Sequence, residues 1–251
     1  MSPKKLATLQ LKKSEYGYYS DPGEDFRMLR NNIEFSSIGA DIKSITVTSG
    51  SPFEGKSTTT ANLAVTMANT YKKVLLVDTD IRVPDLHEKF RIENTIGLTD
   101  ALFAMKNKDS FDMTKYIQKL KHPNITNELF IITAGHPVPN SDMIFHSDVF
   151  KEFMDILKEN FDMIICDTAP ILLVADAIPV SHQTDATLFC VANKITKKDA
   201  AKKAMTLLKR SNVNVIGSII TMIKDKDVQY SSEYYSQNQY NKIRKDIDRN
   251  S

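Results

Sequence analysis

The sequence predicts an α/β protein with a doubly wound, mostly parallel sheet. Six short, β-branched and nearly continuous apolar runs occur between residues 43 and 221: KSITVTS, KVLLVDTD, LFIIT, FDMIICDT, ATLFCVA and VIGSIIT. Stretches with helical periodicity lie between them, at 56–71, 148–160 and 197–210. Because such strands are apolar on both faces, we expect helices to cover both sides of the sheet.

The two ends of the chain differ from this pattern. Residues 1–22 are polar and lysine-bearing and are expected to form a flexible arm, whereas DPGEDFRMLRNNIEF predicts a helix over about 23–37. The apolar pattern stops after Thr221, so 224–251 is interpreted as a flexible, tyrosine-rich tail. The residues between, 23–223, are expected to form one domain, since 251 residues with 41% hydrophobic content can bury a sizeable core.

Composition limits the classes of function. A net charge of +2 does not favour nucleic-acid binding. Cys166 and Cys190 lie inside strand-like runs and are expected to be small core residues rather than a disulfide or a metal pair. No apolar run approaches the roughly 18 residues needed to span a bilayer, and the N-terminus lacks the apolar region of a signal peptide. We therefore expect a cytoplasmic protein.

The segment GSPFEGKS, residues 50–57, fits the phosphate-binding pattern G-x-x-x-x-G-K-[ST]. It follows a predicted strand and opens a predicted helix, where backbone N–H groups and the helix dipole favour a phosphate. We expect Lys56 to reach the β- and γ-phosphates of ATP and the Ser57 hydroxyl to bind Mg²⁺. The expected nucleotide-binding residues are Gly50, Ser51, Pro52, Phe53, Glu54, Gly55, Lys56, Ser57, Thr58 and Arg82.

Carboxylates follow two of the buried strands. Asp78 and Asp80 end one strand, and Asp167 ends another. Ligands of open α/β sheets bind beyond the carboxyl ends of the strands, so these side chains are expected in the same crevice as the phosphate loop. One of Asp78 and Asp80 is expected to help hold Mg²⁺, while the other stands near the γ-phosphate and accepts a proton from an attacking hydroxyl or orients it. Asp167 has the pattern of a Walker B aspartate, and Lys56 and the three aspartates form the predicted catalytic set. Helix N-capping is the structural alternative for each aspartate.

Three segments, VTSGSPFEGKST, LLVDTDIRVP and IICDTAPILLVADA, resemble in order and spacing the nucleotide motifs of the bacterial tyrosine kinases. The resemblance covers about residues 20–240. It implies a P-loop fold of the MinD/ParA-like type, ATP and Mg²⁺ as cofactors, and a protein-tyrosine kinase of capsule or exopolysaccharide production. It also implies Ser57, Asp78 and Asp167 as metal ligands and Asp80 as the residue that engages the attacking hydroxyl. Glu24, Arg27 and Arg30 match the family's E-x-x-R-x-x-R motif, which implies self-association into a homo-oligomer such as a ring. ITAGHPVPN resembles a further family loop.

The resemblance also gives the tail a function. A cluster of four tyrosines matches the family's C-terminal substrate cluster, which implies autophosphorylation between subunits: Tyr230, Tyr234, Tyr235 and Tyr240. In similar Gram-positive systems the kinase is a separate chain, recruited to the inner face of the membrane by the cytoplasmic end of an adaptor of the polysaccharide co-polymerase type. A cognate tyrosine phosphatase is a further implied partner, and nucleic acid is not.

Some residues depart from the family pattern, and two other functions stay open. Phe53 replaces a usual glycine, Ser141 and Asp142 replace a common Pro and Glu, and Thr221 replaces a frequent Asn near the base. A MinD/ParA-type switch ATPase would carry a lysine where this chain has Ser51, and the C-terminus lacks an amphipathic membrane helix. A weakly catalytic regulatory module that binds nucleotide is the other alternative, and Phe53 is its only support.

Overall fold

The computed structural model describes residues 22–36, 41–107, 111–120, 125–138 and 141–223. The chain divides into two units after Thr221, and the first unit holds the helices and strands of the described residues. None of these helices is both long and apolar enough to cross a membrane. In chain order the elements are α1 Pro22–Ser36, β1 Ser44–Ser49, α2 Lys56–Met67, β2 Lys73–Asp78, α3 Leu86–Phe90, α4 Leu98–Lys106, the 3₁₀ turn η1 Met113–Lys115, β3 Gln118–Leu120, β4 Glu128–Ile132, α5 Ser141–Phe145, α6 Asp148–Asn160, β5 Met163–Asp167, α7 Ala177–His182, β6 Ala186–Ala192, α8 Lys198–Arg210 and β7 Val215–Thr221.

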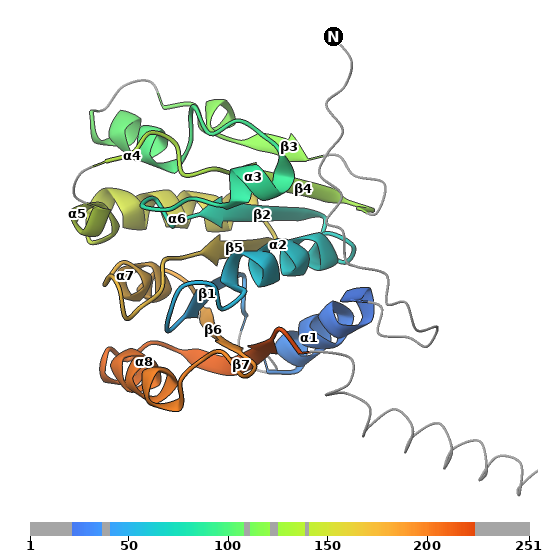
Figure 1. Cartoon of the computed structure of the whole chain (residues 1–251). Coiled ribbons are helices and arrows are strands. Elements are labelled where there is room, and N and C mark those ends of the chain that lie inside the picture. The colour runs from blue at the N-terminus through green and yellow to red at the C-terminus, as the bar shows by residue number, and fades with distance from the viewer. Residues whose placement is uncertain (1–21, 37–40, 108–110, 121–124, 139–140, 224–251) are drawn as a thin grey trace, which may run out of the picture. The chain divides into compact units, whose positions relative to one another are not determined.

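The strands form one seven-stranded sheet in the order β3-β4-β2-β5-β1-β6-β7 (Figure 1). All neighbouring pairs are parallel except β3 with β4, which is antiparallel. The register places Asp78 of β2 directly opposite Asp167 of β5. The predicted fold class, a doubly wound and mostly parallel sheet, is confirmed.

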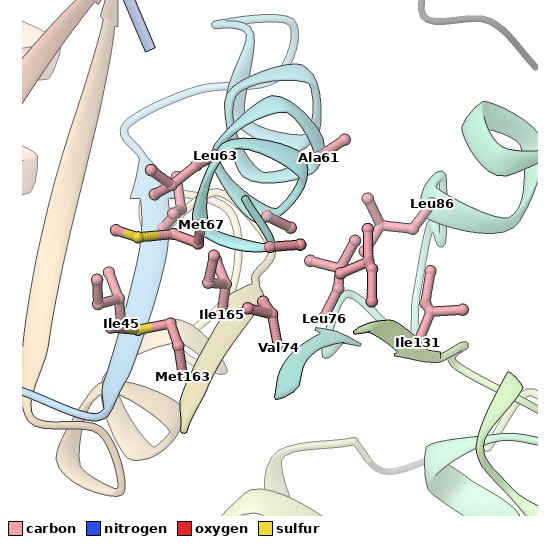
Figure 2. Close-up of a cluster of buried hydrophobic side chains, with 14 of the residues drawn as sticks. Ile45, Ala61, Leu63, Met67, Val74, Leu76, Leu86, Ile131, Met163 and Ile165 are labelled. Atoms are coloured by element: carbon pink, nitrogen blue, oxygen red, sulfur yellow. The ribbon is translucent and has the colours of Figure 1, made fainter. Parts of the chain in front are cut away.

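Helices cover both faces of the sheet. Neighbouring strand residues point to opposite sides, and because both sets of residues are apolar, both faces have to be buried. Val74 and Leu76 of β2 belong to the core beneath α1, α2 and α3 (Figure 2). Leu75 and Val77 of the same strand belong to the core formed with α4, α5, α6 and α7. Phe189 of β6 packs with α8 on that second face. The continuous apolar runs of β1, β2, β5 and β6 therefore reflect burial on both sides, whereas β7, at the edge of the sheet, is only partly buried.

The six strands and four helices expected from the sequence are all present, with shifts at their ends. Helix α2 ends at Met67 rather than residue 71, since the backbone N–H groups of Thr70 and Tyr71 both bond to the Met67 carbonyl in a closing turn. Cys166 and Cys190 are buried and unpaired by disulfide, as predicted. Several short elements were not predicted: α3, α4, η1, β3, α5 and α7.

Candidate active site

The phosphate-binding loop connects β1 to α2. Gly55 adopts a left-handed backbone with φ 81°, which glycine tolerates, and its carbonyl accepts a hydrogen bond from Thr59 N in the first turn of α2. Phe53 also has a positive φ, 61°, and the residue is 89% exposed. The loop therefore delivers Lys56 as the first residue of a helix whose N-terminal amides favour an anion.

Lys56 lies among the strand-end carboxyl groups. Its Nζ is 3.7 Å from Asp80 Oδ2 and 3.8 Å from Asp167 Oδ1, and it lies 3.4 Å from Ser57 Oγ. Burial lowers the pKa of Lys56, but Asp167, Asp80 and Asp78 raise it by more, so the net shift is upward. The lysine is thus held as a buried cation where its side chain can meet a phosphate.

Asp167 is fully buried at the end of β5. Its Oδ1 accepts a hydrogen bond from Thr60 Oγ1 at 3.0 Å, while Oδ2 has no donor within hydrogen-bonding distance among the described residues. Burial raises the pKa of Asp167, against the opposing effects of Lys56 and of the Ser57 and Thr60 hydroxyls. An unbonded buried carboxyl oxygen is costly without a partner, which makes this oxygen a suitable ligand for a cation.

Asp78 and Asp80 differ in their contacts. Asp78 Oδ1 accepts from Asp80 N and Oδ2 from Leu86 N, the first residue of α3, both at 3.2 Å. This is the kind of contact that the helix-capping alternative predicts. Asp80 Oδ1 accepts from Val83 N at 3.2 Å, and its Oδ2 faces Lys56. Burial raises the pKa of both, and Asp78, opposite Asp167, is shifted well above its usual value.

A neighbouring ion pair was not predicted. Arg82 Nε donates to Oδ2 of Asp176 at 2.9 Å, and Asp176 is buried at the start of α7. A signal for Asp176 was present, because this residue stands inside the same motif as Asp167, IICDTAPILLVADA. Arg82, which follows Asp78 and Asp80 in the sequence, therefore contacts the residue that precedes α7.

The residues predicted for self-association lie on α1 and have different surroundings. Glu24 and Arg27 pair with each other along the helix, with Arg27 Nε donating to Glu24 Oε2 at 2.7 Å. Arg30 instead donates from Nη1 to Thr70 Oγ1 at 2.6 Å, just beyond the C-terminal end of α2. Arg30 therefore joins α1 to the end of the helix that Lys56 begins. The tail tyrosines, residues 230–240, lie outside the described residues.

A parallel sheet with a phosphate loop after β1 and buried aspartates after two strands defines a P-loop nucleotide-binding protein. The family described as the CobQ/CobB/MinD/ParA nucleotide binding domain matches residues 45–247. A MinD protein complexed with Mg-ADP from Pyrococcus horikoshii has the same fold, with a TM-score of 0.53 and 22% identity over 71% of this chain and 69% of that one.

Two further comparisons narrow the family. Tyrosine-protein kinase YwqD of Bacillus subtilis is 38% identical over 211 residues, which cover 84% of each chain. The crystal structure of the chimerical protein CapA2B2 superposes with a TM-score of 0.72 at 32% identity, covering 82% of this chain and 87% of that one. The chain belongs to the bacterial tyrosine kinase family, within the MinD/ParA-like P-loop proteins, and is a protein-tyrosine kinase.

Proposed function

We propose that this kinase transfers the γ-phosphoryl group of MgATP to tyrosines 230, 234, 235 and 240 in the tail of a neighbouring copy. The observation that carries the proposal is the buried Lys56 at the start of α2, between the strand-end carboxyl groups of Asp80 and Asp167. This arrangement supplies a cation for the phosphates and acidic groups for a metal and a hydroxyl in one small volume.

Mg²⁺ fits the oxygen atoms that the site offers. The proposed ligands are the Ser57 hydroxyl, the unbonded Asp167 oxygen and Asp78, with the nucleotide phosphates completing the shell. No group of three or more His, Cys, Asp or Glu side chains suited to a metal occurs among the described residues, so the phosphates are needed as ligands. When bound, the ion neutralises charge on the transferred phosphoryl group.

Asp80 is the residue we assign to the attacking phenol. In the transfer, the tyrosine oxygen forms a bond to the γ-phosphorus, the bond from that phosphorus to the β–γ bridging oxygen breaks, and ADP leaves. The phenolic proton passes to Asp80, whose pKa burial raises. Lys56 holds the phosphates while its contact with Asp80 keeps the base beside them.

The proposed partners follow from the family and from the chain's charge. We assign this kinase to capsular or exopolysaccharide biosynthesis, acting with the cytoplasmic end of a membrane adaptor that recruits it to the inner face of the membrane. A homo-oligomer formed through Glu24, Arg27 and Arg30 and reversal by a tyrosine phosphatase complete the proposal. The balanced charge, +2 overall, gives no support to a nucleic-acid partner.

The test is to incubate the purified chain with MgATP, with and without the cytoplasmic end of the adaptor, and to map phosphate by mass spectrometry. We expect phosphate on the four tail tyrosines, and none in Lys56→Met, because that change removes the phosphate-binding cation. ATP hydrolysis with unmodified tyrosines would favour a switch ATPase instead. Nucleotide binding without hydrolysis or transfer would favour the regulatory module, and unchanged transfer in Lys56→Met would refute the site.

A further inference from the structure

We infer that Glu54, Thr196 and Thr221 act as positioning residues that fix the phosphate loop through hydrogen bonds to its backbone and to the Glu54 side chain. We call these three residues the loop brace. The inference rests on the proposed nucleotide site but changes the role of Glu54, which the sequence predicts to contact the nucleotide. It also gives a role to two threonines that the phosphate-binding pattern does not include.

Glu54 has its side chain fully occupied by protein contacts. It is 1% exposed, its Oε2 accepts a hydrogen bond from Ser51 N at 2.9 Å, and its Oε1 accepts from Thr196 Oγ1 at 2.6 Å. An acceptor-only carboxyl group directed at a phosphate would repel it. Both Glu54 oxygens instead bond the loop's own backbone and the segment after β6, so the side chain shapes the loop.

Thr221 contacts the same part of the loop through its side-chain hydroxyl, which bonds to the loop backbone. Its Oγ1 donates to the Glu54 carbonyl at 2.7 Å. A methyl group placed on Gly55 would lie 3.1 Å from Thr221 Cβ, closer than most real contacts of that kind. Thr221 therefore packs against the peptide between Glu54 and Gly55, and the P-loop glycine leaves the room for it.

Thr196 is itself held by the chain. Its Oγ1 accepts from Ala192 N at 2.8 Å while donating to Glu54. The loop brace thus links the loop after β1 to the ends of β6 and β7, the next two strands in the sheet. A loop held in its bound conformation before ligand arrives loses less conformational entropy on binding, so the brace should strengthen nucleotide affinity.

The position of Thr221 in the sequence connects the phosphate loop with the end of β7. Thr221 is the last residue of β7 and immediately precedes the segment that carries the tail tyrosines. The last residue of β7 is therefore hydrogen-bonded to the carbonyl of Glu54, two residues before the phosphate-binding lysine. A change at this threonine should alter nucleotide binding although no catalytic group is touched.

The experiment uses the full chain and measures the affinity for MgADP by isothermal titration calorimetry. Thr221→Val keeps the shape but removes the hydroxyl, and we expect the Kd for MgADP to rise about 3–10-fold, as loss of one hydrogen bond implies. Thr221→Ser keeps the hydroxyl and should restore most of the affinity. Thr206→Val is the matched control, since Thr206 bonds within α8 to the Lys202 carbonyl. In kinase assays the KM for ATP should rise more than kcat falls.

Thr196→Val gives an independent measurement if Thr221→Val does not fold, and it should weaken MgADP binding in the same direction. Melting temperatures without nucleotide separate a loss of folding from a loss of affinity. The inference is overturned if both valine variants bind MgADP like the parent chain, or if Thr221→Ser is as weak as Thr221→Val. Unchanged MgADP binding in Lys56→Met would instead refute the nucleotide site on which the inference rests.

Discussion

Lys56 is surrounded by carboxyl groups that burial makes costly to ionise. Asp167 and Asp78 are fully buried and Asp80 is 6% exposed, and burial raises the pKa of all three. One lysine cannot compensate three buried carboxylates without a cation. The site is therefore arranged for the nucleotide-bound state at the expense of the stability of the ligand-free chain.

Asp167→Asn tests this balance. The amide can still accept the Thr60 hydrogen bond, while the variant removes a buried charge whose second oxygen lacks a partner. We expect the melting temperature of the nucleotide-free chain to rise by about 2 °C or more, the shift that roughly 1 kcal/mol produces at this size. Calorimetry with saturating MgATP should show a smaller ligand-induced rise than in the parent. A less stable nucleotide-free variant would contradict the argument.

The stability gain should also depend on pH. The folded pKa of Asp167 lies above its usual value of 3.8, so the folded state holds the proton more tightly than the unfolded state. The parent therefore loses stability as the pH rises through the folded pKa, and Asp167→Asn does not. Urea unfolding of both proteins from pH 5 to pH 8 measures the difference between their free energies of unfolding. The advantage of Asp167→Asn over the parent should grow as the pH rises and stay constant above the folded pKa. An advantage that shrinks with rising pH would contradict an upward shift of that pKa.

The backbone of Phe53 is strained, and this strain lowers the stability of the folded chain. Its φ of 61° disfavours any residue with a Cβ atom, and its exposed ring contributes little packing. Phe53→Gly should therefore be about 1 kcal/mol more stable than Phe53→Ala, since only glycine relieves the strain. Thermal unfolding of the two variants checks this as a difference of roughly 2–4 °C. An alanine variant as stable as the glycine variant would show that the loop is unstrained.

The residues of the site were predictable to different degrees. Lys56 and the three aspartates follow from a contiguous motif and from strand ends, because parallel strands bring their carboxyl ends to one edge. The contacts of the acidic side chains were predictable only in part: the bond from Leu86 N to Asp78 is of the kind that the helix-capping alternative predicts, whereas the bond between Thr196 and Glu54 was not predicted. Glu54 and Thr196 lie 142 residues apart in the sequence, and no local pattern encodes their contact.

At the scale of elements, α1 is attached to the domain through one of its two motif arginines. The Arg30 side chain is 20% exposed and bonds to Thr70, whereas Arg27 is half exposed and pairs with Glu24 on the same helix. The two arginines of the E-x-x-R-x-x-R motif therefore have different roles in this chain. Arg30 holds α1 against the end of α2, and Arg27 lies on the outer side.

Amide hydrogen exchange of residues 22–36 tests the attachment. Arg30→Ala should speed exchange throughout α1, because the helix loses its hydrogen bond to Thr70. Thr70→Val removes the same bond from the other side and should have a similar effect. Arg27→Ala is the matched control and should change exchange only locally. Equal protection of α1 in all four proteins would show that its apolar face alone holds it.

The elements that the sequence did not predict share a physical cause. Strand β3 has three residues and α3 has five, too few to show a periodicity of 2 or 3.6. Helix α4 is nine residues long, but its N-cap residue is Gly97, whose N–H bonds to Asp100, and this is a weaker signal than a serine or threonine cap. Long, doubly buried strands were predictable because their composition alone separates them from surface helices.

At the scale of the whole molecule, the proposed transfer requires tyrosines that follow β7 in the sequence to reach an active site at the end of β1. Thr221 ends β7, which is separated from β1 only by β6. Tyr230 follows Thr221 by nine residues, and an extended chain of that length spans up to roughly 30 Å. Two strand spacings amount to only about 10 Å. Reach alone therefore permits transfer within one chain as well as between chains.

Mixing two full-length variants separates these routes. The acceptor is Lys56→Met with an intact tail, and the donor is an active chain with its four tail tyrosines changed to phenylalanine. If transfer occurs between copies, mass spectrometry should find phosphate on the acceptor's tail, at a rate per acceptor that rises with donor concentration. A parent chain that modifies itself at a concentration-independent rate, with the acceptor unmodified, would establish transfer within one chain.

Repeating the mixture with Arg27→Ala and Arg30→Ala in both proteins tests whether α1 brings the copies together. If it does, light scattering should show monomers, and transfer between the copies should be slower. Transfer that is slowed without any change in oligomeric state would instead place the effect of Arg30 in its contact with Thr70, inside the subunit.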